Sequence, residues 1–150
     1  MDQLRLRAAE PDEAAAITEL ARRSKAYWGY SREFLDRVRD ELTVHAHQIR
    51  AGTVVVAADG ATLLGYYRLD GAPPDGELAD LFVEPGAIGT GLGRRLWDDA
   101  VAQARQRGFR SLELEADPNA EAFYRHVGAR KTGERQVASG RTLPVLRIDV

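Results

Sequence analysis

A chain of 150 residues with 21 Lys and Arg, 23 Asp and Glu and a net charge of −2 predicts a single domain, residues 1–150. The near-neutral balance argues against a general electrostatic attraction to nucleic acid or to an anionic membrane, so any anion site must be local. The chain has no cysteine, which excludes disulfides, thiolate metal sites and a cysteine nucleophile and is typical of a reducing compartment.

The first half of the chain is expected to form a strand, two helices and a β-hairpin. These elements are a strand over 3–9, a helix over 11–26, a helix over 31–42 and a hairpin over 53–70. Pro11 suits the first turn of a helix, and Ser31 is a favourable N-cap for the second helix. Asp59 and Gly60 separate two runs rich in β-formers, which indicates a hairpin turn.

The second half alternates strands with helices. We expect a loop over 71–76, a strand over 77–85, a helix over 92–107, a strand over 111–116, a short helix over 119–127 and strands over 130–136 and 141–150. The helix between them forces the strands at 77–83 and 111–115 to run parallel. The order β-α-α-β-β-β-α-β-α-β-β predicts an α/β (α+β) fold with a mixed, mainly antiparallel central sheet of about seven strands and four flanking helices.

The segment IGTGLGRRLW, residues 88–97, places three glycines at alternating positions where the helix over 92–107 begins. Glycine lets main-chain N–H groups approach an anion closely, and a helix N-terminus favours negative charge. A dinucleotide-binding fingerprint is not matched, because Arg94 stands where its third glycine is needed. A P-loop is not matched either, because Leu92 and Gly93 stand where Lys and Ser or Thr are needed. A phosphate-binding turn and a tight turn without ligand stay open as interpretations.

Two motifs occur together: a V-x-P strand end at 83–85 followed by GLGRRL at 91–96, and PNAEAFYRHVGARKTGE at 118–134. The combination resembles the GCN5-related N-acetyltransferase (GNAT) family over nearly the whole chain. The resemblance implies a GNAT-like sheet and acetyl coenzyme A as co-substrate, its pyrophosphate held by the glycine loop and its thioester in a splayed gap between the parallel strands. Ile88 departs from the Gln or Arg usual in the family, which matters little if backbone amides bind the phosphates. The implied coenzyme-binding residues are Leu81, Phe82, Val83, Ile88, Gly89, Thr90, Gly91, Leu92, Gly93, Arg94, Asn119 and Tyr124.

Acyl transfer to an amine needs a neutral nucleophile, stabilisation of the oxyanion and a proton for the leaving thiolate. The resemblance implies that Tyr124 is the general acid, with a role as a core aromatic beside Phe123 as the alternative. Asn119 has an alternative role as the N-cap of its helix. For the general base the resemblance implies a carboxylate, Asp80 or Glu77, or an ordered water, with Asp80 slightly preferred. The two carboxylates lie on opposite faces of a regular strand, and each is otherwise a solvated strand residue.

Acceptor specificity is expected in the segment SKAYWGYS, residues 24–31, which joins the first two helices. The family commonly builds its acceptor pocket there. Tyr27, Trp28 and Tyr30 either cage an amine by cation–π contact or fill the core beneath the loop. His45 and His47 have no obvious third ligand, so we expect surface histidines and no metal site.

The resemblance therefore predicts an acetyl-CoA-dependent N-acetyltransferase. A cytoplasmic location is expected, since the sequence has no signal-peptide pattern and no apolar run of about 18 residues. The acetyl group is expected to pass to a primary amine of a small molecule or peptide by direct attack in a ternary complex. No nucleic-acid or membrane partner is expected, and a homodimer stays open. The alternative is a catalytically silent acyl-CoA-binding or regulatory module of the same fold. O-acetylation and another acyl group also stay open.

Overall fold

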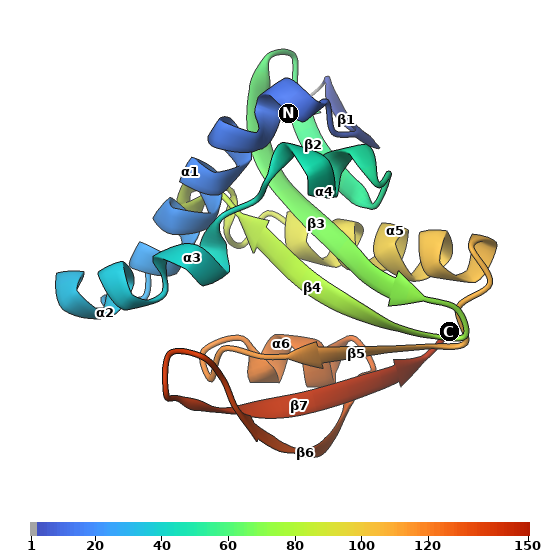
Figure 1. Ribbon diagram of the computed structural model, residues 1–150. Coiled ribbons are helices and arrows are strands. Elements are labelled where there is room, and N and C mark those ends of the chain that lie inside the picture. Colours follow the sequence, from blue (N-terminus) through green and yellow to red (C-terminus); the bar gives the residue numbers. More distant parts are fainter. Residues whose placement is uncertain (1–2) are drawn as a thin grey trace. The chain divides into compact units, whose positions relative to one another are not determined.

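The computed structural model describes residues 3–150, which form seven strands and several helices (Figure 1). The strands are β1 (Leu4–Ala8), β2 (Val54–Asp59), β3 (Thr62–Ala72), β4 (Asp75–Val83), β5 (Ser111–Glu115), β6 (Arg130–Gln136) and β7 (Thr142–Asp149). Their hydrogen-bonded order is β1-β2-β3-β4-β5-β7-β6. β4 and β5 pair in parallel, whereas β1 with β2, β2 with β3, β5 with β7 and β6 with β7 pair antiparallel. The predicted mixed, mainly antiparallel sheet of seven strands is confirmed.

The helices are more numerous than the four expected. Within residues 3–150 they are α1 (Ala14–Ala26), α2 (Arg32–Arg37), α3 (Arg39–Leu42), α4 (Ala46–Arg50), α5 (Leu92–Gln106) and α6 (Glu121–His126), with the 3-10 turns η1 (Pro11–Glu13) and η2 (Pro85–Ala87). The helix expected over 31–42 begins as predicted, because the Phe34 N–H donates to the Ser31 hydroxyl. It is interrupted at Val38, whose φ of −93° and ψ of 6° leave the helical region. Val38 and Leu42 are both buried in the core, so tertiary packing sets this break.

Two shorter segments differ from the expectation for local reasons. α4 was not predicted, since its five residues are too few to show a helical period. Its first turn is held by the His45 N–H, which donates to Gln48 Oε1, and by the buried Ile49. The loop expected over 71–76 is mostly strand, because β3 continues to Ala72 and β4 begins at Asp75. At that point the Ser111 hydroxyl donates to the Asp75 carboxylate and the strand pairing with β5 starts.

The residue contacts divide the chain into two compact units. Unit 1 contains the described residues up to Arg68 together with Asp80–Leu96, and unit 2 contains Leu69–Ala79 together with Trp97–Val150. The prediction of one domain over 1–150 stays a prediction. None of the helices within residues 3–150 has the length and apolar character needed to cross a membrane.

Unit 1 has an apolar core that positions the end of β4. The core contains Ile17, Leu20, Ala21, Phe34, Val38, Leu42, Val44, Ile49, Val54, Val56 and Tyr66. Gly65 on β3 has no room for a side chain, since a Cβ there would lie 2.9 Å from Leu96 Cδ1 and 3.0 Å from the Phe82 carbonyl oxygen. β3, the end of β4 and the first turns of α5 therefore approach closely, which fixes both ends of the glycine loop.

Unit 2 has its own core around β5 and β7. Leu112, Leu114 and Leu146 are almost completely buried. Gly76 on β4 leaves space for the Phe109 ring, which would lie 2.5 Å from a Cβ at that position. α5 ends as expected before Gly108, whose φ of +88° suits a helix C-terminus. The parallel pairing of β4 with β5 covers Asp75–Glu77 and Ser111–Glu113 and, within the described residues, extends no further along either strand.

Candidate functional site

The glycine loop, residues 86–91, joins η2 to α5. Gly89 and Gly91 have φ values of +83° and +86°, a region that residues with a Cβ rarely adopt. No heavy atom lies within 4 Å of an ideal Cβ at either position. Both glycines are therefore needed for the backbone conformation rather than for close packing within the chain, and the space beside them is open.

The loop leads directly into the N-terminus of a 15-residue helix. In α5 the Arg95 N–H donates to the Gly91 carbonyl oxygen at 3.1 Å. The N–H groups of Leu92 and Gly93 precede that bond, so helix geometry gives them no acceptor within the helix. The helix dipole adds partial positive charge there, and Arg94 is exposed beside it. These groups fit a phosphate, as the glycine spacing predicts.

The entrance to the loop is held by a residue that sequence reasoning missed. Glu84 accepts three hydrogen bonds from the guanidinium of Arg23 on α1, at 2.7, 2.9 and 3.0 Å. Its N–H also donates to the Leu64 carbonyl oxygen on β3 at 2.8 Å. Glu84 is the middle residue of the V-x-P motif, but its partner Arg23 is 61 positions away, so spacing alone gave no signal for the pair.

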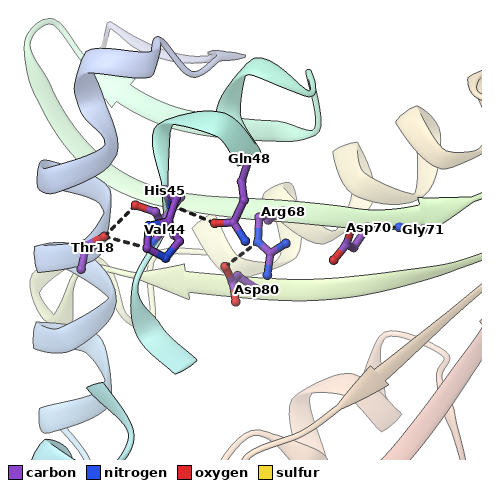
Figure 2. A network of polar contacts seen from close by, with 8 residues as sticks. All are labelled: Thr18, Val44, His45, Gln48, Arg68, Asp70, Gly71 and Asp80. Carbon is purple, nitrogen blue, oxygen red and sulfur yellow. Dashed lines mark hydrogen bonds and ion pairs between the residues drawn. The ribbon is translucent and has the colours of Figure 1, made fainter. Parts of the chain in front are cut away.

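Asp80, the preferred candidate base, lies in a polar cluster of unit 1. Figure 2 shows its carboxylate facing Arg68 of β3, and Arg68 Nε donates to Asp80 Oδ2 at 3.1 Å. Both side chains are largely buried, with 16% of Arg68 and 10% of Asp80 exposed. Burial, and secondly the charge of Asp80, raise the pKa of the nearby Tyr66 hydroxyl well above its usual value. Asp80 is thus an ion-paired residue and not a solvated strand carboxylate.

The same view shows how α1 is attached to the segment before α4. The Val44 N–H donates to the Thr18 hydroxyl at 2.9 Å, and that hydroxyl donates back to the Val44 carbonyl oxygen at 3.3 Å (Figure 2). The rings of His45 and His47 stack with centroids 5.4 Å apart, and both residues are exposed. The expectation of surface histidines is confirmed.

Glu77, the second candidate base, lies in unit 2 among other carboxylates. It is in register with Glu113 across the parallel strands. Arg135 donates to Glu113 at 2.8 Å, and its guanidinium lies 3.9 Å from Glu115. The hydrogen bond to Glu113, followed by the charges of Glu113, Glu115 and Glu77, raises the pKa of Arg135. Glu77 and Asp80 therefore have different surroundings, as opposite faces of one strand predict.

Tyr124, the candidate general acid, is 7% exposed and packs in unit 2. Its ring centroid lies 5.7 Å from that of Trp97 and 5.2 Å from that of Phe123. The alternative role for Asn119 is wrong, because Ala120 is the N-cap of α6. Instead, the main-chain N–H and the side-chain amide of Asn119 both donate to Asp117 Oδ1, at 2.8 and 2.9 Å. The tight turn at 117–120 holds Asn119 outside the helix.

The three aromatics of the acceptor segment do not share one environment. Tyr27 is 52% and Trp28 44% exposed, and their rings meet edge to face. Tyr30 instead stacks on Phe34 with centroids 4.3 Å apart and packs against the core of unit 1. Lys25 Nζ lies 5.5 Å from the Tyr30 ring centroid. The core-filling alternative thus describes Tyr30, whereas Tyr27 and Trp28 lie at the surface.

The other predicted coenzyme-binding residues lie at the end of β4, in the glycine loop and at the start of α5. Leu81, Phe82 and Val83 form the partly buried end of β4, and Ile88 is 37% exposed. The Thr90 hydroxyl donates to the Ala87 carbonyl oxygen, which tightens the turn before Gly91. All of these residues belong to unit 1, together with the N-terminus of α5.

Solved structures of acetyltransferases resemble this chain along its length. PaiA N-acetyltransferase from Thermoplasma acidophilum, in complex with coenzyme A, is 17% identical with a TM-score of 0.77, covering 98% of this chain and 99% of that one. A GCN5-related N-acetyltransferase from Rhodopseudomonas palustris is 22% identical with a TM-score of 0.81, covering 100% and 98%. The protein yncA from Salmonella typhimurium, with its cofactor acetyl-CoA, is 22% identical with a TM-score of 0.69, covering 97% and 93%.

These TM-scores show that the chain shares its fold with the three structures. The family model described as "Acetyltransferase (GNAT) domain" matches residues 9–146, which include the glycine loop, α5 and α6. With the motif pair, the sheet and the family model in agreement, the chain belongs to the GNAT acetyltransferase family.

Proposed function

We propose that the protein is an acetyl-CoA-dependent N-acetyltransferase. The observation that carries the proposal is the pair Gly89 and Gly91, both with positive φ and open space beside them, immediately before the N-terminus of α5. Such a loop offers main-chain N–H groups to a pyrophosphate without steric hindrance from side chains. The family match supports the proposal, as do the similar structures solved with coenzyme A or acetyl-CoA.

Coenzyme binding is assigned to the main chain more than to charged side chains. The N–H groups at the start of α5 and in the glycine loop hold the pyrophosphate, with Arg94 as cationic support. The backbone of Leu81–Val83 pairs with the pantetheine arm. Asn119 is a further contact, oriented by its two hydrogen bonds to Asp117.

The reaction is direct acyl transfer. A neutral primary amine attacks the thioester carbonyl carbon, a C–N bond forms and the C–S bond breaks. The Val83 N–H stabilises the developing oxyanion, the Tyr124 hydroxyl protonates the leaving thiolate, and a carboxylate accepts the proton released by the amine. With no cysteine in the chain, an acetyl-thioester intermediate on the enzyme is excluded.

Asp80 is the first candidate for the accepting carboxylate and Glu77 the second. The Asp80 carboxylate is held in one orientation by Arg68. Glu77 lies instead beside Glu113 and Arg135. For the acceptor we assign the exposed rings of Tyr27 and Trp28, with Tyr30 supporting the turn from below.

Turnover separates the enzyme from a silent acyl-CoA-binding module. Purified protein is incubated with acetyl-CoA and a panel of primary amines, while free thiol and acetylated product are measured. We expect thiol release that depends on the amine and equals the amount of product. Calorimetric binding of acetyl-CoA without amine-dependent thiol release would instead identify the silent module.

A further inference from the structure

A cavity of about 480 Å³ lies in unit 1 between α1, α2 and α3. Four arginines line it, Arg22 and Arg23 from α1, Arg32 from α2 and Arg39 from α3, together with Asp36 and three apolar side chains. The cavity is open to solvent and mostly apolar in lining, and its four arginine side chains bring positive charge to it. It adjoins both helices that flank the segment 24–31, which carries the exposed pair Tyr27 and Trp28.

Two of these arginines already have carboxylate partners. Arg23 binds Glu84, and Arg39 lies 3.2 Å from Asp36. Neither Arg22 nor Arg32 takes part in an ion pair among residues 3–150. Moreover, the Nε atom of Arg22 is buried and has no hydrogen-bond acceptor in this part of the chain. A buried N–H without an acceptor within the protein is unfavourable, so a ligand oxygen that accepts from this guanidinium would be stabilising.

Arg23 connects the cavity with the glycine loop. It lines the cavity, and the same guanidinium binds Glu84 where the chain enters the loop. Both features belong to unit 1, and Arg22 lies on α1, the helix that Arg23 attaches to the proposed coenzyme-binding segment.

We propose that Arg22 and Arg32 bind a carboxylate or phosphate group of the acceptor, so that the substrate is an amine carrying both an anionic group and an apolar portion. This inference rests on the proposed acetyltransferase function. A guanidinium offers paired N–H donors that match the two oxygens of a carboxylate or phosphate. The apolar wall accommodates the remainder of the molecule, and the exposed aromatic pair lies next along the chain from α1.

Paired amines test the substrate class. Leucine is compared with leucinamide, and phosphoethanolamine with ethanolamine, by kcat/KM for acetyl transfer calculated for the neutral form of each amine. We expect the wild-type protein to prefer one of the anionic amines over its neutral counterpart by about tenfold or more, the scale of a hydrogen bond to a charged group. The two pairs distinguish a carboxylate from a phosphate. Equal kcat/KM within both pairs would overturn the proposal.

Variants connect that preference to the cavity. Arg22→Gln and Arg32→Gln, alone and together, are expected to abolish the preference, and Arg22→Lys to restore only part of it, because lysine keeps the charge without the paired donors. Arg37→Gln is the matched control, since Arg37 lies on α2 and does not line the cavity. Arg32 is exposed, so the single Arg32→Gln variant tests the site even if a change at Arg22 prevents folding.

A binding measurement separates this inference from the acetyltransferase proposal. Inorganic phosphate and leucine are titrated into the protein without acetyl-CoA, and the arginine Nε–Hε signals are followed by NMR. Movement of the Arg22 signal, absent in Arg32→Gln, supports the anion site even if no amine is acetylated. If the Arg22 signal does not shift with either ligand, the anion site is wrong. Absence of turnover alone would contradict only the enzymatic function.

Discussion

Unit 1 and unit 2 carry different kinds of functional group. Unit 1 has open, hydrogen-bond-donating features: the glycine loop, the start of α5 and the arginine-lined cavity. Unit 2 has the buried Tyr124 between aromatic rings and Asn119 held by Asp117. Binding an anion requires donors that the chain leaves accessible, whereas a proton donor must be kept in one position by packing. Changes in the glycine loop and the cavity should therefore alter binding, and a change at Tyr124 should alter turnover.

Asp80 departs from this pattern, because it is a proposed catalytic residue in unit 1. If it is the base, Asp80→Asn should lower kcat by about 10²–10⁴-fold, the usual range for general-base catalysis. The change also leaves the largely buried Arg68 guanidinium without its carboxylate, so the thermal midpoint should fall. The kinetics are therefore measured below the unfolding range, as kcat against pH.

Two variants serve as controls for Asp80. Arg68→Met combined with Asp80→Asn removes the guanidinium that has lost its carboxylate and should recover stability but not kcat. Glu77→Gln should retain most of kcat. If Glu77→Gln loses turnover while Asp80→Asn keeps it, the base is Glu77 in unit 2.

Tyr124→Phe tests turnover in unit 2. The ring and its contacts with Trp97 and Phe123 are retained, so the fold should survive. Loss of the hydroxyl should lower kcat by about 10²-fold, the low end for a general acid, because a thiolate is already a fair leaving group. Acetyl-CoA affinity by calorimetry should be unchanged. Tyr67→Phe, which removes the hydroxyl of another buried tyrosine, is the matched control.

A wild-type kcat in Tyr124→Phe, with chemistry shown to be rate-limiting, would leave water or the incoming ammonium as the proton source. A loss of coenzyme affinity in the same variant would instead assign Tyr124 to coenzyme binding. The contrast between binding groups in unit 1 and a turnover group in unit 2 would then not hold.

Gly91→Val tests binding in unit 1. Valine disfavours the φ of +86°, so the loop should change conformation and acetyl-CoA affinity should fall by about tenfold, as expected from 1–2 kcal/mol of backbone strain. Gly52→Val is the matched control, because Gly52 has a φ of +83° and equally open surroundings at the turn after α4. Similar affinities of Gly91→Val and the wild type in calorimetry would exclude residues 89–94 as the phosphate-binding segment.

Trp28→Ala should have the smallest effect. An exposed cation–π contact is worth about 0.5–1 kcal/mol, so the acceptor KM should rise about two- to fivefold while the KM for acetyl-CoA is retained. The melting temperature should change little, since 44% of Trp28 is exposed. Tyr30→Ala should instead lower it, because Tyr30 stacks on Phe34. Equal increases of both KM values in Trp28→Ala would argue against an acceptor role.

The sequence predicted helices and strands well where a few neighbouring residues are enough to define the element. The strand over 130–136 has the predicted bounds, and Ser31 caps its helix through the Phe34 N–H. The helix over 31–42 was predicted as continuous because its apolar spacing is helical, yet the buried Val38 leaves the helical region. Propensity and periodicity do not include the packing that decides such a break.

The glycine loop and its place before α5 were determined by the sequence itself, because a positive φ is a local requirement that glycine meets at little cost. The motif pair likewise identified the family that the fold and the family model confirm. Tertiary structure alone decided which charged groups meet: Arg23 with Glu84, Arg68 with Asp80, and the arginines around the cavity. Each ion pair joins side chains from different elements, and the cavity exists only where three helices meet. Those arrangements follow from how the elements pack, which spacing along one chain does not contain.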